Sequence, residues 1–209
     1  VTWTTWICRC ESMLRRFAII GHRAPSSGKI NLNDLAGSSG RLDVLARAVN
    51  TALFLSHGIR DDSQVILHLL GGPGPARRIF FAGDNVRGLH PDERAIAGQI
   101  GRALKEPVPA IGQKSELHSG FWHSGGTIEQ TLAEWRKEGV SIFVLDAEGQ
   151  DICDLENTQG PMGFILSDDQ PFSENDLDIF KDENQLSLGR QWLQGHACIS
   201  IIHHVLDQS

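Results

Sequence analysis

Residues 186–198 read LSLGRQWLQGHAC and are the most informative part of the sequence. A short apolar segment ends at Gly189, and a loop then leads into an apolar helix. Two earlier segments that are typical of strands, over residues 141–146 and 162–167, also end in loops. Three strand-end loops close to one another predict a small-molecule pocket at the carboxyl edge of a parallel sheet.

Length and composition predict a globular protein with one domain. The chain has 209 residues, of which 40% are hydrophobic and 22% charged, so it can bury a sizeable core. A clean strand pattern begins directly after Met13. We therefore expect a single domain over residues 13–209 and an extension over residues 1–12 outside the fold. An ordinary N-terminal arm is the alternative interpretation of those first residues.

The charge of the chain argues against a protein that coats nucleic acid through an extended basic surface. The formal net charge is −7 at pH 7. A local basic patch is still compatible with this sum, because the distribution of charge matters more than the total. The basic residues are concentrated in the first half of the chain: Arg41, Arg47, Arg77, Arg78, Arg87, Arg94, Arg102 and Lys105.

The sequence favours a cytoplasmic protein with neither a membrane span nor a metal site. No apolar run approaches the roughly 20 residues that cross a bilayer. The four cysteines are irregularly spaced, which is typical of reduced thiols. Cys8 and Cys10 lack a second pair, so they do not predict a zinc site. The adjacent His203 and His204 point in different directions on a helix, and we expect them in solvent or at the edge of the core.

Segments typical of strands and of helices alternate along the chain. Strands are expected over residues 14–20, 64–70, 78–82, 141–146 and 162–166, and helices begin near residues 42, 91, 127, 173 and 198. A long polar loop is expected over residues 21–40. On the last helix, the apolar face is expected to hold Cys198, Ile201, Ile202 and Val205. The alternation predicts an α/β fold with a largely parallel sheet flanked by helices.

Two glycine-rich stretches do not fit nucleotide-binding motifs. Six residues separate Gly21 from Gly28-Lys29, where a phosphate loop has four, and Ile30 follows the lysine where the motif needs serine or threonine. The run over residues 71–75 contains prolines and is typical of a rigid turn at a strand end. A nucleotide hydrolase that uses Lys29 is therefore the least favoured function.

Arg41-Leu42-Asp43 opens a predicted helix and has two interpretations. One is an ordinary helix start with a surface ion pair, in which Asp43 also pairs with Arg47 four residues later. The other is a substrate site, because arginine binds phosphate bidentately and aspartate can accept a proton or a hydrogen bond from a nucleobase. Spacing alone favours the structural interpretation.

Several segments in a fixed order resemble the archaeal tRNA pseudouridine N1-methyltransferases and their bacterial relatives. These enzymes are members of the SPOUT class of RNA methyltransferases. No single tetrapeptide is decisive, but the ordered set is specific and extends over roughly residues 13–208. The segments that carry the resemblance are residues 20–25, 32–35, 40–45, 55–57, 91–94, 186–189 and 196–201.

The resemblance implies a fold, a cofactor and partners. The fold is a mostly parallel sheet flanked by helices, with a deep C-terminal trefoil knot, and the assembly is a homodimer. The cofactor is S-adenosylmethionine, bound in the knot loops beside the partner subunit. The RNA substrate is tRNA or another structured RNA. The implied cofactor-binding residues are Leu145, Ser167, Leu186, Ser187, Leu188, Gly189 and Cys198.

The implied reaction moves the sulfonium methyl group to N1 of pseudouridine. That nitrogen is a free N–H in pseudouridine, whereas it carries the sugar in uridine. Arg41 and Asp43 match the family's motif and become the predicted catalytic residues. We expect Arg41 to bind phosphate or base, and Asp43 to orient the base or accept its proton.

One position departs from the archaeal pattern and leaves an alternative function open. Archaeal members tend to carry glycine where this chain has Ser167. A side chain there either narrows the methionine end of the pocket or replaces a backbone contact. Ser167 and the acidic net charge suggest the alternative, a non-catalytic RNA-binding or ribosome-associated module.

Overall fold

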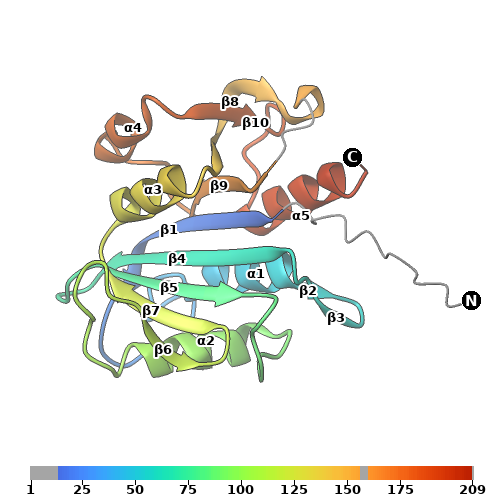
Figure 1. The fold of residues 1–209 in the computed structure, drawn as a ribbon. Helices are drawn as coiled ribbons and strands as arrows, with labels where there is room; N and C mark the ends of the chain where they lie inside the picture. The colour runs from blue at the N-terminus through green and yellow to red at the C-terminus, as the bar shows by residue number, and fades with distance from the viewer. Residues whose placement is uncertain (1–13, 156–159, 209) are drawn as a thin grey trace, which may run out of the picture.

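An eight-stranded sheet runs through the middle of the computed structural model, which describes residues 14–155 and 160–208 (Figure 1). The strands lie in the order β10-β8-β9-β1-β4-β5-β7-β6. Their bounds, in that order, are Asn184–Ser187, Ser141–Asp151, Met162–Ser167, Arg15–Pro25, Ser63–Gly71, Arg77–Ala82, Phe121–Gly125 and Ser115–His118. The expected extension over residues 1–12 lies outside the described residues.

Strand pairing divides this sheet into a parallel part and an antiparallel part. β10, β8, β9, β1 and β4 pair in parallel, and β5, β7 and β6 continue the sheet from β4 in antiparallel pairing. The predicted α/β fold with a mostly parallel sheet is confirmed. β6 and β7 were not predicted. In β7 the buried positions include the polar His123 and Ser124, so the strand has no apolar period in its sequence.

Helices cover both faces of the sheet because successive residues of the central strands point to opposite sides. Phe17 and Ile19 of β1 pack on one face in a core shared with α1, α2 and α5. Ala18 and Ile20 pack on the other face with α3 and α4. In chain order the helices are α1 (Leu42–Leu53), α2 (Glu93–Ala103), α3 (Ile128–Lys137), α4 (Glu174–Phe180) and α5 (Gly195–Leu206).

Three short elements complete the described chain. β2 (Phe54–Leu55) and β3 (Gly58–Ile59) form a small antiparallel pair after α1. A single 3₁₀ turn, Ile152–Asp154, follows β8.

The helix starts follow local capping rules that can be read from the sequence. The Asp92 side chain accepts a hydrogen bond from the backbone N–H of Ala95 at 2.8 Å and begins α2. Capping boxes begin α3 at Thr127 and α4 at Ser173.

The structure corrects three details of the expected elements. β1 continues to Pro25, so the loop expected over residues 21–40 begins five residues later. The buried side of α5 includes Ile199 and His203, which were not predicted; of the predicted face, Ile202 is buried, and Cys198 and Val205 pack partly buried against the same core. His203 is buried because its Nε2 bonds to the Ala52 carbonyl at 3.2 Å and its Nδ1 to Arg15 at 3.0 Å. His204 is exposed, in agreement with the expectation.

Within residues 14–155 and 160–208, no helix combines the length and apolar character needed to cross a membrane. In the same ranges, no group of three or more histidine, cysteine or acidic side chains is arranged to hold a metal ion. The trefoil knot that the resemblance implies stays a prediction.

Candidate active site

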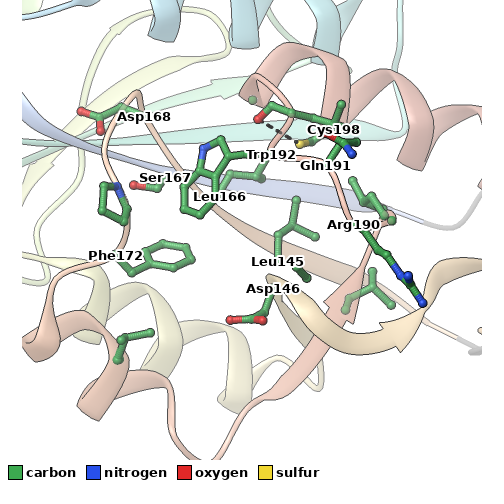
Figure 2. Close-up of a pocket in the computed structure, with 18 residues that line it drawn as sticks. Leu145, Asp146, Leu166, Ser167, Asp168, Phe172, Arg190, Gln191, Trp192 and Cys198 are labelled. Carbon is green, nitrogen blue, oxygen red and sulfur yellow. Dashed lines mark hydrogen bonds between the residues drawn. The ribbon is translucent and has the colours of Figure 1, made fainter.

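A cavity of about 340 Å³ lies at the carboxyl ends of β9 and β10, beside the middle of β8 (Figure 2). Its size is within the range of small-molecule sites. β8 contributes to it because the strand leaves the ladder: Val144 pairs with Gln185, but the next partner of β10 is Gln150. Residues 145–149 are therefore free of pairing with β10. The predicted pocket at the ends of three strand segments is present.

Six of the seven residues expected to bind the cofactor line this cavity. They are Leu145, Ser167, Leu186, Leu188, Gly189 and Cys198. Ser187 is the exception, because its hydroxyl group is turned into the loop. It donates to the Ala147 carbonyl at 3.1 Å and accepts from the Gly189 N–H at 3.2 Å. Ser187 thus shapes the β10–α5 loop instead of lining the cavity.

The walls of the cavity combine apolar and charged groups. Leucines from three strands form the apolar part, and Phe172 and Trp192 add aromatic rings near the rim (Figure 2). The charged groups are Asp146, Asp168 and Arg190. Such a lining can hold a flat apolar ring together with hydroxyl or ammonium groups.

Two side chains of the cavity are less reactive than their residue types suggest. Ser167 donates its hydroxyl hydrogen to the Gln170 carbonyl, so its single donor is used inside the β9–α4 loop. Burial raises the pKa of the Cys198 thiol. The thiol is therefore protonated at neutral pH and suits packing better than nucleophilic attack.

His22 joins the end of β1 to the cavity and to α4. Its Nδ1 lies 3.1 Å from Asp168 Oδ1, and its Nε2 lies 3.1 Å from Asp176 Oδ2. Its backbone N–H donates to Asp168 Oδ2 at 2.9 Å. Burial alone would lower the pKa of His22, but hydrogen bonds and charges from the two carboxylates raise it above the ordinary value of 6.5.

Sequence reasoning included His22 only within a matching segment and assigned it no role. His22 and Asp168 are 146 positions apart, so no local sequence pattern links them. The register of the parallel strands could have revealed this contact, because Ile20 pairs with Ser167 and the residues that follow them therefore lie close together.

Arg41 and Asp43 form a bidentate ion pair at the start of α1. Arg41 Nε lies 2.9 Å from Asp43 Oδ1, and Arg41 Nη2 lies 3.1 Å from Asp43 Oδ2. Arg47 Nη2 also bonds to Asp43 Oδ2 at 2.5 Å, as the i,i+4 spacing predicts. Arg41 has φ 63°, a left-handed conformation that costs a residue with a side chain about 1–3 kcal/mol.

The electrostatic surroundings make Asp43 a weak base. Burial alone would raise the pKa of its carboxyl group, but the hydrogen bonds and charges of Arg41 and Arg47 lower it below its ordinary value. A carboxylate with a lowered pKa holds a proton poorly. Between the two roles expected for Asp43, this geometry favours orientation over proton acceptance.

The Arg41–Asp43 pair lies next to the cavity, although Arg41 is 128 positions away from Asp169 of the β9–α4 loop. Arg41 Nη1 bonds to Asp169 Oδ2 at 3.1 Å, and the preceding residue, Asp168, lines the cavity. Arg47 Nη1 lies 3.4 Å from Oε1 of Gln194, whose two neighbours in the chain, Leu193 and Gly195, line the cavity. The fold therefore brings together the two sets of residues that were expected to act on one reaction.

The glycine-lysine stretch lacks the context of a phosphate loop. Gly28 and Lys29 belong to a loop, and α1 begins only at Leu42. A phosphate loop needs a helix directly after its glycines, so the hydrolase interpretation receives no support from the structure.

Comparison with known proteins finds relatives that match nearly the whole chain. The sequence profile of a family described as "Putative SAM-dependent RNA methyltransferase" matches residues 14–209. The tRNA (pseudouridine(54)-N(1))-methyltransferase of Methanococcoides burtonii is 36% identical over 198 residues, which cover 94% of this chain and 97% of that protein. Its counterpart from Methanospirillum hungatei is 39% identical over 192 residues, covering 92% and 95%.

A solved structure of low sequence identity shares the fold. It is Archaeoglobus fulgidus Nep1 bound to S-adenosylhomocysteine, which superposes with a TM-score of 0.60 and 12% identity, covering 94% of this chain and 98% of that one. At this identity the likeness concerns the fold alone.

Proposed function

Because the chain belongs to the family of SAM-dependent RNA methyltransferases, we propose that it methylates N1 of pseudouridine in tRNA, at position 54, the target named for its relatives. The observation that carries the proposal is that the β9–α4 loop contacts both the cavity and the Arg41–Asp43 pair. Asp168 lines the strand-end cavity, and Asp169 contacts Arg41 of the Arg41–Asp43 pair. A transfer reaction needs its two substrates next to each other.

The cavity fits S-adenosylmethionine by its chemistry. Leu145, Leu186, Leu188 and the Cys198 region would pack against the adenine ring, and the backbone of residues 186–189 would bind its edge. The carboxylates of Asp146 and Asp168 suit ribose hydroxyl groups and an ammonium group. When bound, the cofactor supplies an electrophilic methyl group on sulfur.

On the RNA side, Arg41 would bind a phosphate or the target base. Asp43 would hold the Arg41 guanidinium in place, since both of its oxygens bond to that group. The lowered pKa of Asp43 supports this positioning role over proton acceptance. Alignment of N1 with the methyl group would then carry much of the rate.

A homodimer in the cytoplasm is part of the proposal. Trp192 is 79% exposed and Leu177 is 49% exposed, and both lie at the cavity. Large apolar side chains at the rim of a site favour coverage by a second copy or by a ligand. Cys153 and Cys198, the cysteines that the structure describes, are free thiols, which suits a reducing compartment.

The non-catalytic alternative loses its main support in this geometry. Ser167 was expected to obstruct the pocket or replace a contact, but its hydroxyl group bonds within its own loop. A binding-only module would bind RNA without binding the cofactor, and its RNA affinity would not change in Asp43→Asn.

The first test is calorimetric titration of the protein with S-adenosylmethionine and S-adenosylhomocysteine, beside Ser167→Gly. Saturable binding by the parent is expected. Methyl transfer is then measured with tritiated cofactor on two tRNA transcripts, one with pseudouridine and one with uridine at position 54. Incorporation only into the pseudouridine transcript is expected. Cofactor binding without transfer to either transcript would contradict the proposed substrate.

A further inference from the structure

Asp169 accepts hydrogen bonds from two arginines on a single carboxylate oxygen. Arg23 Nη2 and Arg41 Nη1 both bond to Asp169 Oδ2, the second at 3.1 Å. The side chains remain open to solvent: 49% of Arg23, 32% of Arg41 and 23% of Asp169 is exposed. Two guanidinium groups thus converge on one point at the protein surface, beside the cavity.

The backbone fixes this convergence. Gly40 and Gly71 pack against the Arg23 backbone so closely that a Cβ would lie 2.1 Å and 2.3 Å from the Arg23 carbonyl oxygen. Arg41 directly follows Gly40. Asp43 holds the Nε and Nη2 edge of Arg41, which leaves Nη1 for Asp169. The position of both arginines is therefore built into the fold around Gly40.

We propose that Arg23 and Arg41 form a binding site for a backbone phosphate of the RNA, and that Asp169 occupies this site in the free protein. The inference rests on the proposed function and adds a residue, Arg23, and a competing group, Asp169. A phosphate oxygen accepts the same charge-assisted hydrogen bonds as a carboxylate oxygen. Ion pairs this exposed are weak, so an RNA phosphate can replace the carboxylate.

The exchange is coupled to the cavity through the β9–α4 loop. Asp168 precedes Asp169 and is fixed by two bonds to His22, and Gln170 donates its N–H to Asp168 Oδ1 at 3.0 Å. Only the Asp169 side chain has to leave its place, because the rest of the loop is held. RNA would therefore bind at the arginines without disturbing the residues that line the cavity.

The test measures the binding of a tRNA transcript by fluorescence anisotropy in four variants. Arg23→Gln and Asp169→Asn alter the proposed site. Arg136→Gln and Glu183→Gln break an arginine–carboxylate pair near the amino ends of the strands and change the net charge by the same amounts. Any effect of net charge alone appears equally in both sets.

Arg23→Gln is expected to weaken binding roughly tenfold relative to Arg136→Gln, and to reduce the slope of log affinity against log salt by about one contact. Asp169→Asn is expected to strengthen binding about threefold to tenfold relative to Glu183→Gln, because the phosphate no longer competes with a carboxylate. Cofactor affinity, measured by calorimetry, should stay within about twofold in all four variants, which shows that they fold.

The direction in which Asp169→Asn changes RNA affinity shows whether Asp169 competes with the phosphate or positions the arginines. If Asp169 merely positions the arginines, the variant weakens binding, and this result overturns the proposal. Equal effects in the two sets overturn it as well. A parent protein that binds cofactor but no tRNA overturns the proposed function together with this inference, whereas tRNA binding that is unchanged in Arg23→Gln overturns the inference alone.

Discussion

At the scale of single residues, Arg41 combines a strained backbone with a guanidinium group that donates a hydrogen bond from each of its three nitrogens. It is the one residue other than glycine with positive φ among those the structure describes, and its guanidinium bonds to Asp43 and Asp169. Strain of this kind persists where surrounding contacts over-determine a position, and it is typical of functional sites. The two interpretations of Arg41-Leu42-Asp43 are therefore compatible, because the residue begins α1 and also faces the cavity loop.

Asp43→Asn tests the positioning role of this carboxylate. The variant keeps the shape but weakens the charge-assisted bonds to Arg41 and Arg47. Methyl transfer is expected to fall roughly tenfold or more, with cofactor affinity unchanged within about twofold. Single-turnover transfer and calorimetry measure the two quantities. If Asp43 were instead the proton acceptor, the loss of methyl-transfer rate in Asp43→Asn would become smaller as the pH rises, because hydroxide would replace the missing base.

Ser167→Gly tests the departure from the archaeal pattern. Ser167 lines the cavity, but its hydroxyl group bonds to the Gln170 carbonyl, so its removal is expected to change cofactor affinity by no more than about threefold. The measurement is calorimetry with S-adenosylhomocysteine, and Ser167→Ala is the matched control. A gain of a hundredfold in the glycine variant would mean that Ser167 blocks the site.

At the scale of elements, the cavity depends on where the pairing between neighbouring strands stops and the chain continues as a loop. The ladder from β8 to β10 is interrupted over residues 145–149, at the end of the strand segment expected over residues 141–146. Gly149 permits the return to pairing, since a Cβ there would lie 2.5 Å from the Gln185 carbonyl carbon. The sequence predicts the strand and the loop, but the renewed pairing at Gln150 depends on contacts with β10.

His22 links β1 to α4, and its effect on stability depends on pH. Its pKa is raised above 6.5 in the folded protein, where it faces the carboxylates of Asp168 and Asp176. The stabilisation is fully present below 6.5 and is lost as pH rises through the raised pKa. The difference in unfolding free energy between the parent and His22→Gln should be larger at about pH 5.5 than at about pH 9, measured by urea denaturation. A difference independent of pH would contradict the charged pairing.

Gly40→Ala tests the close approach that positions Arg23. The new Cβ would overlap the Arg23 carbonyl oxygen, and φ 60° adds left-handed strain. We expect destabilisation by roughly 2–4 kcal/mol in urea denaturation. Gly28→Ala is the control, because it has φ 94° but no atom within 4 Å, and it should lose only about 1 kcal/mol. Similar losses in the two variants would show that the contact with Arg23 is unimportant.

At the scale of the whole molecule, the sequence predicts the layers better than it predicts the sheet edge. Apolar periods in α1, β1, β4 and β9 predict a core with helices on both faces, and the structure confirms it. β7 carries the buried polar residues His123 and Ser124, and β6 has no buried residue, so neither antiparallel strand has a comparable signal. The proximity of Arg41 to the cavity also cannot be predicted from the sequence, because it results from the order of the strands in the sheet and not from the spacing of residues along the chain.

The proposed dimer predicts an effect of Trp192, which is 79% exposed at the cavity. Trp192→Ser removes the largest apolar side chain from the rim, and an anchor of this kind carries much of an interface's energy. Sedimentation velocity should show a dimer for the parent and a shift to monomer, or a dissociation constant at least tenfold higher, for the variant. Trp122→Ser, at a half-buried position on β7, is the matched control. A monomeric parent would contradict the proposed assembly.

The exposure of Trp192 also gives the protein an intrinsic optical reporter. The chain has five tryptophans, and Trp135 is buried, so the part of the quenching by added iodide or acrylamide that disappears in Trp192→Ser reports the exposed indole. A ligand in the cavity would shield that indole as its own concentration rises, whereas a second subunit would shield it as the protein concentration rises. Two quenching titrations on the unlabelled protein, each compared with Trp192→Ser, therefore separate occupancy of the cavity from self-association.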